Sequence, residues 1–263
     1  MQAHRLALAF CCLIALLCGQ AACRRSDPAT DLTTSVKPDP NKVIDDILAK
    51  YISAIGGQSA VEQVKSFAGK GTFSVSAFNQ TETGVYEVWG KDPHKTLSVV
   101  TFPRGIVIKH GFDGNTRWYQ VPGGITSEEG PANEMAEVER NADIYSPGGI
   151  RKLYESMRLE GKARLNKRDV EVIEGKPEKG PSDKLFFESE SGLLVRWDMV
   201  RRNPKRGNLF VKIHLADYRE VNGVKTPFSV RFSFESFGLS FKLDELTHNV
   251  ALDDAIFQQP KIR

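Results

Sequence analysis

The sequence has no cysteine after its first 23 residues. The chain of 263 residues contains four cysteines, and all of them, Cys11, Cys12, Cys18 and Cys23, lie at the amino terminus. The remaining chain therefore cannot form a disulfide scaffold, a zinc ribbon or an iron–sulfur cluster, and it has no thiol nucleophile. The chain also lacks a large excess of one sign of charge, since it has 36 basic and 33 acidic residues. Because nucleic-acid-binding proteins usually show a strong basic excess, nucleic acid is not an expected partner.

Long hydrophobic runs are absent as well. The run at residues 6–17 is apolar and uncharged, but it is shorter than the roughly 20 residues that a transmembrane helix needs. A short apolar run that follows a basic residue, here Arg5, and precedes small residues is typical of a signal peptide. We therefore expect a signal peptide over residues 1–22.

The segment Gly-Gln-Ala-Ala-Cys at residues 19–23 is similar to a bacterial lipobox, in which the cysteine becomes the first residue and is acylated, for example with palmitate. One departure is Gln20, which occupies the position where a lipobox usually has an aliphatic residue. The alternative is ordinary secretion with cleavage near Ala21 or Ala22. On the first interpretation Cys23 carries the lipid, and multiple acyl chains hold a protein durably on a membrane.

Residues 23–40 would then comprise the lipidated cysteine and a flexible tether, because they are polar, proline-containing and aperiodic. The expected location is the periplasmic side of a membrane in the cell envelope. Arg24, in place of an aspartate after the cysteine, favours the outer membrane.

Two helices are expected at the start of the folded region. Asp39 and Pro40 suit the N-cap and the first turn of a helix. In the residues that follow, apolar side chains recur at helical spacing and form one stripe, which ends at Gly56-Gly57. Ser59 and Glu62 have the spacing of a capping box, which predicts a second, short helix from Ser59.

Strand signals dominate from Phe67 onward. Asn222-Gly223 is a strong signal for a two-residue hairpin turn, and this turn pairs Leu215 with Val230 and Ile213 with Phe232. Every such pair is apolar, and a slip of one residue would move these side chains to the opposite face, so the register is well specified. The pattern predicts an antiparallel sheet with one apolar face. Further strands are expected at 85–89, 97–102, 106–112, 118–121 and 193–199.

The apolar face is rich in phenylalanine, since nine of the 15 phenylalanines lie between residues 186 and 257. Helices must cover such a face. The first helix is one candidate, and the segment 133–154, which is broken by Ser146-Pro147-Gly148-Gly149, is a candidate plug or lid. This order of elements predicts an α+β fold in which one curved sheet wraps around helices.

Several segments together resemble the bacterial outer-membrane lipoprotein-sorting proteins, the LolA/LolB-like superfamily. The resemblance covers residues 41–260 and includes AIGG (54–57), VKSFAGKGTF (64–73), GFDGNTRW (111–118), SGLLVRW (191–197), DYREVNGVKTPFSVRF (217–232) and DDAIFQQP (253–260). The resemblance implies that residues 41–263 form a half-open antiparallel β-barrel whose concave face is covered or plugged by helices. It further implies a hydrophobic cavity that holds acyl chains of lipoproteins or lipids, or a surface that binds a regulatory protein.

We therefore expect a lipid-anchored binding protein and not an enzyme. The predicted cavity lining is Trp197, Phe228, Phe232, Phe234, Phe237 and Phe241, with Met135 and Leu153 on the lid. A well-packed core that uses the same phenylalanines without any ligand remains an alternative. So does a protein-interaction or sensory subunit of a cell-envelope complex.

Sites for chemistry are not evident. The four histidines beyond the signal peptide, His94, His110, His214 and His248, are far apart, and neither H-E-x-x-H, G-x-S-x-G nor a P-loop occurs. No metal and no cofactor is expected. Asp113-Gly114-Asn115 indicates a turn, and Asp253-Asp254 indicates the cap of a last short helix. The basic segment 201–206 suits either a solvated hairpin tip or a contact with anionic lipid headgroups.

Overall fold

The computed structural model describes residues 39–128, 149–178, 180–203 and 207–261. All of them belong to one compact unit, Pro38–Arg263. The predicted signal peptide, the predicted lipid anchor at Cys23 and nearly all of the predicted tether lie outside the described residues, and so does Met135.

Two helices open the unit. Helix α1 (Pro40–Ala54) is capped by Asp39, whose side chain accepts a hydrogen bond from the Asn41 backbone N–H, as predicted. Its apolar stripe buries Ile44, Ile47, Leu48 and Tyr51, and complete burial of side chains of this kind contributes about 1.5–3 kcal/mol each.

The predicted capping box of the second helix is wrong. The N-cap of helix α2 (Gln58–Glu62) is Gly57, two residues before the predicted cap Ser59, and glycine has no side chain to donate or accept a hydrogen bond. Ser59 therefore lies inside the helix. Glu62 instead accepts a 2.5 Å hydrogen bond from the Gln58 side chain one turn earlier, so it is not free to reach back to the cap.

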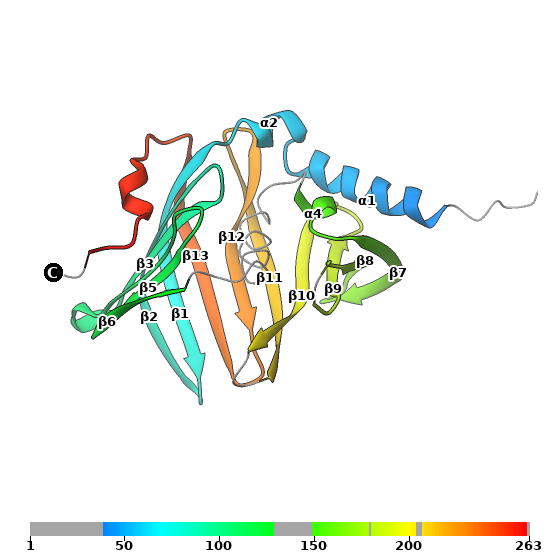
Figure 1. Ribbon diagram of the computed structural model, residues 1–263. Helices are drawn as coiled ribbons and strands as arrows, with labels where there is room; N and C mark the ends of the chain where they lie inside the picture. The colour runs from blue at the N-terminus through cyan, green and yellow to red at the C-terminus, as the bar shows by residue number, and fades with distance from the viewer. Residues whose placement is uncertain (1–38, 129–148, 179, 204–206, 262–263) are drawn as a thin grey trace, which may run out of the picture. The chain divides into compact units, whose positions relative to one another are not determined.

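The rest of the unit is a single antiparallel sheet of 13 strands (Figure 1). The strands are β1 (Ser66–Ala77), β2 (Gln80–Lys91), β3 (Lys95–Thr101), β4 (Val107–Phe112), β5 (Arg117–Val121), β6 (Gly124–Glu128), β7 (Ser156–Leu165), β8 (Arg168–Lys176), β9 (Asp183–Glu188), β10 (Leu194–Asn203), β11 (Gly207–Val221), β12 (Val224–Ser233) and β13 (Phe237–His248). Their order is β6-β5-β4-β3-β2-β1-β13-β12-β11-β10-β9-β8-β7. The sheet is not closed, which confirms the predicted half-open barrel.

The hairpin predicted from Asn222-Gly223 has the expected register. Leu215 pairs with Val230 and Ile213 with Phe232, and the next hairpin pairs Phe232 with Leu239. Side chains of alternate residues thus share one face, here called the inner face, which includes Ile213, Leu215, Val230 and Phe232. One departure is at Asp217, where a positive φ of 53° interrupts the pairing of β11 with β12.

Helix α1 covers the inner face at one end of the sheet. Its buried side chains form one core cluster with Ile173, Leu185 and Trp197 of β8, β9 and β10. The short helix α4 (Gly149–Lys152) adds Ile150 to the same cluster. Figure 1 shows α1 and α4 beside β7–β10, away from β1–β5.

The outer face of β2–β5 carries a second, smaller cluster. Here the 3₁₀-helix η3 (Asp254–Phe257), capped by Asp253 as predicted, packs Phe257 against Trp118 and Leu97. A single-turn 3₁₀-helix, η1 (Pro103–Gly105), connects β3 with β4. The sheet is therefore packed on its inner face at the α1 end and on its outer face at the β5 end.

Candidate functional site

The inner face beyond α1 contains an open groove of about 610 Å³. It runs across β12, β13 and β1–β5, and residues of α2 and of the β2–β3 turn border it. Ligand pockets usually measure about 300–1,000 Å³, so the groove is large enough for a small organic molecule or a hydrocarbon chain.

Small residues create the groove. Gly90, Thr96 and Ser98 line it at inner-face positions of β2 and β3. A Cβ atom at Gly90 would come within 2.2 Å of the Phe67 ring, so this ring lies directly over the glycine backbone. Phe67 fills the space over Gly90, whereas the small side chains of Thr96 and Ser98 leave the neighbouring surface of β3 hollow.

One wall of the groove is apolar and lies on β12 and β13. Phe241 is its centre, with ring centroids 5.0 Å from Phe73, 4.9 Å from Tyr86 and 5.7 Å from Phe232. Such tilted and edge-to-face contacts are favourable geometries for aromatic rings. The residues of this apolar wall are Phe228, Val230, Phe232, Phe241, Leu243 and Leu246.

The other wall is polar and lies on β3–β5. Tyr119 pairs with His110, and His110 pairs with Ser98, so these three side chains stand in one row across three strands. Arg117 and Thr96 line the groove from the next row. The Arg117 guanidinium donates a 3.1 Å hydrogen bond to the Tyr119 hydroxyl, and the rings of His110 and Tyr119 meet edge to face at 4.8 Å. These five residues are called the polar wall.

The histidine of the polar wall favours its neutral form. Surrounding protein atoms desolvate the ring, although its edge is open to water along the groove, and this desolvation is the main cause of a lowered pKa at His110. The positive charge of Arg117 lowers the pKa further. His248, which lines the groove from β13, also has its pKa lowered by burial.

The lysines at the rim of the groove are held by carboxylates. Lys65 forms an ion pair of 3.3 Å with Asp92. Lys91 and Lys95 both bind Asp254, at 2.7 Å and 2.5 Å, and these hydrogen bonds lower the pKa of Asp254 to about 2. Each of these three lysines therefore has a carboxylate partner, although Lys91 and Lys95 share one.

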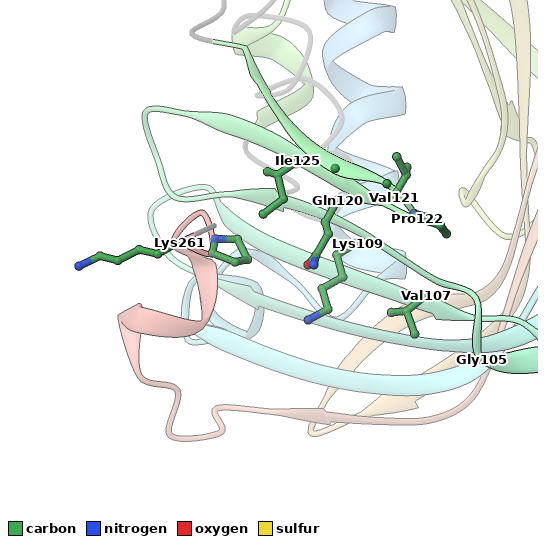
Figure 2. A pocket seen from close by; sticks show the side chains of 11 residues that line it. Gly105, Val107, Lys109, Gln120, Val121, Pro122, Ile125 and Lys261 are labelled. Atoms are coloured by element: carbon green, nitrogen blue, oxygen red, sulfur yellow. The ribbon is translucent and has the colours of Figure 1, made fainter. Parts of the chain in front are cut away.

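A second hollow of about 620 Å³ lies near the β5–β6 turn (Figure 2). Lys109 and Gln120 face it from the outer side of β4 and β5, and Pro260 and Lys261 border it from the carboxy-terminal segment. It mixes glycine backbone, two lysines and a few aliphatic side chains, and it lacks an extended apolar wall.

The structure separates the six phenylalanine and tryptophan residues that the sequence suggested as a cavity lining. Phe228, Phe232 and Phe241 line the groove. Trp197 does not line it, because it is fully buried in the core cluster under α1. Its indole N–H donates a 3.1 Å hydrogen bond to Asp183, which also accepts one from Tyr154.

Phe234 and Phe237 lie at the tip of the β12–β13 hairpin and do not line the groove. Their rings stack at 4.1 Å, and Phe237 is 38% exposed. Of the two lid residues, Leu153 packs against the core cluster under α1. Met135 and the acylation site at Cys23 fall outside the described residues.

Sequence reasoning missed the polar wall. The only signal was the alternation in Arg117-Trp118-Tyr119, where a strand that buries Trp118 must present its two neighbours on the opposite face. From the sequence, His110 and His248 are only histidines far apart in the chain, and nothing in the sequence places them on one groove.

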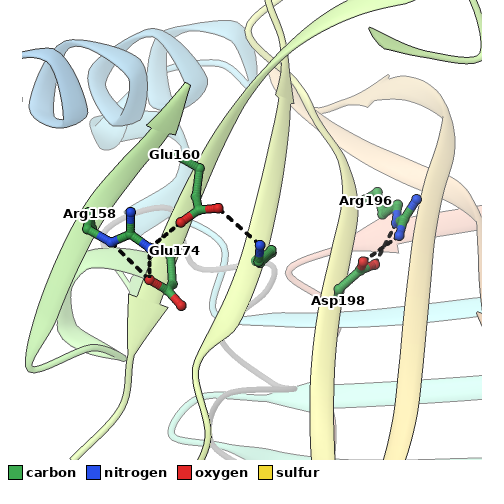
Figure 3. Close-up of polar contacts among 6 residues, drawn as sticks. Arg158, Glu160, Glu174, Arg196 and Asp198 are labelled. Carbon is green, nitrogen blue, oxygen red and sulfur yellow. Dashed lines mark hydrogen bonds and ion pairs between the residues drawn. The ribbon is translucent and has the colours of Figure 1, made fainter. Parts of the chain in front are cut away.

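Other charged groups in the described part of the chain are structural. Arg158, Glu160, Glu174 and Lys184 form a ladder of ion pairs across the exposed strands β7–β9 (Figure 3). Among described residues, no cluster of histidine, aspartate and glutamate has the arrangement of a metal site. Within the same residues, no helix is both long and apolar enough to cross a bilayer. Residues 204–206 of the predicted basic tip lie outside them.

Comparison with known proteins identifies the fold. No protein-family model and no curated protein matches the sequence. A DUF1329 family protein from Desulfovibrio piger has a similar fold, with 17% identity, a TM-score of 0.57 and coverage of 84% of this chain and 98% of that one. A putative outer membrane lipoprotein-sorting protein domain from Vibrio parahaemolyticus has 11% identity and a TM-score of 0.54, with coverage of 81% of this chain and 94% of that one. A LolA superfamily protein from Nitrosomonas europaea has 14% identity and a TM-score of 0.53, with coverage of 82% of this chain and 97% of that one. The chain therefore has a LolA/LolB-like fold.

Proposed function

We propose that this protein binds the hydrocarbon chain of a lipid or of a lipid-modified protein in the groove on the inner face. The apolar wall carries the proposal. Its aromatic and aliphatic side chains border a hollow that helix α1 leaves uncovered. The similarity to a structure described as a lipoprotein-sorting protein domain supports the same function.

Burial of a chain in this groove would supply the affinity. Each methylene transferred from water contributes about 0.8 kcal/mol, so a chain of about ten buried methylenes gains roughly 8 kcal/mol before the cost of ordering both partners is subtracted. No covalent step is needed for this function. The protein would act as a carrier or acceptor whose guest is held by burial.

The setting of this function is also part of the proposal. Residues 1–22 would direct export, and an acylated Cys23 would anchor the domain on the periplasmic side of the outer membrane through the tether at 23–40. A domain tethered in this way would receive or pass on hydrophobic guests close to the membrane surface.

The experiment measures uptake of a fluorescent fatty acid by the purified protein. Phe232→Asp places a charge on the apolar wall, and we expect it to weaken binding roughly tenfold or more, because an unpaired carboxylate is costly in an apolar site. The matched control is Phe210→Asp, since Phe210 is 69% exposed and does not line the groove. Circular dichroism and thermal unfolding identify variants that fail to fold.

Two results would contradict the proposal. One is a folded Phe232→Asp variant that binds the fatty acid as well as the wild type does. The other is an organic extract of the purified protein that contains no lipid, together with a stoichiometric protein partner and no uptake of the fatty acid. That second result would favour a protein-interaction subunit of an envelope complex.

A further inference from the structure

Arg117 differs from the other cations around the groove. The lysines at the rim are held by carboxylates, as described above. The only hydrogen bond of the Arg117 side chain within the described part of the chain goes to the neutral hydroxyl of Tyr119. Among the described side chains, no carboxylate lies within ion-pair distance of it. Arg117 is half-buried and lines the groove.

The neighbours of Arg117 are hydrogen-bonding groups of the right kind for an anion. The Tyr119 hydroxyl accepts a hydrogen bond from Arg117, so its own proton is free to point toward a guest. Thr96 and Ser98 add two hydroxyl groups, and the neutral form of His110, which its lowered pKa favours, offers one N–H donor.

The size of this patch is that of a small headgroup. Neighbouring strands lie about 4.8 Å apart and alternate residues of a strand about 7 Å apart. Three strands and two rows therefore give a surface of roughly 10 by 7 Å, in which five of the six positions are polar and Phe112 of β4 is the sixth. The two carboxylates that line the groove lie outside it, and each already has a partner: Glu62 accepts from Gln58, and Asp92 binds Lys65.

We propose that the guest of the groove is an amphiphile with an anionic headgroup, a carboxylate or a phosphate. Its headgroup binds Arg117 and the hydroxyl groups of the polar wall, and its chain lies on the apolar wall of β12 and β13. This inference rests on the proposed function, because it assigns the headgroup of the same guest. Arginine suits the role, since its planar guanidinium can hold two oxygen atoms of a carboxylate or phosphate at once.

The test compares the affinities of three probes with the same chain, dodecanoate, dodecyl phosphate and dodecanol, by calorimetry at neutral pH or slightly above. The expected result is that both anions bind the wild type at least tenfold more tightly than the alcohol does, and that this preference decreases when salt is added. Arg117→Gln should remove the preference but change the affinity for dodecanol less than twofold. Lys109→Gln is the matched control, because it removes one positive charge from the outer face of the neighbouring strand.

The outcomes separate the two proposals. Equal binding of all three probes, or a preference that survives Arg117→Gln, would overturn the anionic headgroup and leave the hydrocarbon site intact. Failure of all three probes to bind would overturn the proposed function itself. Inorganic phosphate is the fourth probe: binding of phosphate alone without any of the chains would identify a simple anion site and would also overturn the amphiphile. The wild-type comparison stands even if Arg117→Gln does not fold.

Discussion

The indole N–H of Trp118 donates a 2.8 Å hydrogen bond to the backbone carbonyl of Phe257. Trp118 is 1% exposed and Phe257 fully buried, so the bond is sealed from water on the outer face of β5. Trp118 stands between Arg117 and Tyr119 in the sequence. By fixing the outward side chain, the carboxy-terminal segment holds its two neighbours toward the groove.

Trp118→Phe should destabilise the protein by about 1–3 kcal/mol, because it leaves the buried Phe257 carbonyl without a donor. Urea unfolding followed by circular dichroism measures the change. Trp89→Phe is the control, since Trp89 packs against the same outer cluster but makes no hydrogen bond to Phe257. Equal losses in the two variants would show that ring size matters and the hydrogen bond does not.

Gly111→Ala should be more damaging than its size suggests. A Cβ atom there would come within 2.1 Å of the Trp118 ring, which is held by both η3 and the sheet and has little room to move. Overpacking of this kind typically costs about 1–3 kcal/mol. Gly124→Ala, where no atom lies within 4 Å of the added carbon, should stay close to wild type. A thermal midpoint for Gly111→Ala equal to that of Gly124→Ala would contradict the close packing described here.

Asp254 should make stability depend on pH in the acid range. Its pKa falls from the ordinary value of 3.8 to about 2 because it accepts hydrogen bonds from Lys91 and Lys95. A depressed pKa means that the unfolded chain takes up the proton first. The stabilisation from Asp254 is therefore complete above pH 3.8 and is lost as the pH falls toward 2.

Urea midpoints measured at several pH values between 2 and 5 test this prediction. The wild type should lose stability over this range more steeply than Asp254→Asn, which removes the titrating group and keeps the shape of the side chain. The same reduction in slope is expected when Lys91 and Lys95 are both changed to glutamine. Parallel pH profiles for all three proteins would show that the ion pairs at the rim do not contribute.

Filling the groove should block guest binding without unfolding the protein. Ser98 lies in the centre of the hollow between Val88 and His110, so Ser98→Trp would occupy space that the guest needs. We expect at least a tenfold loss of affinity for the fluorescent fatty acid, with a stability change below about 1 kcal/mol. Ser98→Ala is the control: it removes one hydroxyl contact to the headgroup without filling the groove, so its loss of affinity should be much smaller than that of Ser98→Trp. Undiminished binding by Ser98→Trp would place the guest elsewhere.

Parts of the fold follow from local sequence because one strong signal determines each of them. Asn222-Gly223 determines the turn, and the apolar pairs around it then determine the register of β11, β12 and β13. Asp39 and Asp253 cap helices because their short side chains reach the first free backbone N–H groups. In each case the residues that decide the structure are within a few positions of one another.

The three strands from residue 156 to 188 are not among the predicted strands, although β7 carries a strand signal. Its residues alternate between polar and apolar or small side chains from Ser156 to Leu165, as expected for a strand at the edge of a sheet. Its pairing with β8 is supported by ion pairs such as that of Arg158 with Glu174, which only the folded structure brings together.

The misplaced Trp197 illustrates a different limit. Trp197, Ile213 and Phe232 form one row across β10, β11 and β12, so the sequence correctly predicts that they share a face. What it cannot show is how far α1 extends over that face. The helix covers Trp197 and leaves Phe232 beside the groove, because cover is decided by contacts between segments more than a hundred residues apart.

The arrangement of β5 also bears on how the ligand specificity of such a protein could evolve. Packing against η3 involves only Trp118 of this triplet, while Arg117 and Tyr119 line the groove and belong to neither core cluster. Substitutions at these two positions would change the proposed headgroup site and leave the contact of Trp118 with Phe257 in place. Insertion of a single residue in β5 before Arg117 would instead turn Trp118 toward the groove. The packing of Trp118 against η3 and the orientation of Arg117 and Tyr119 toward the groove would then be lost together.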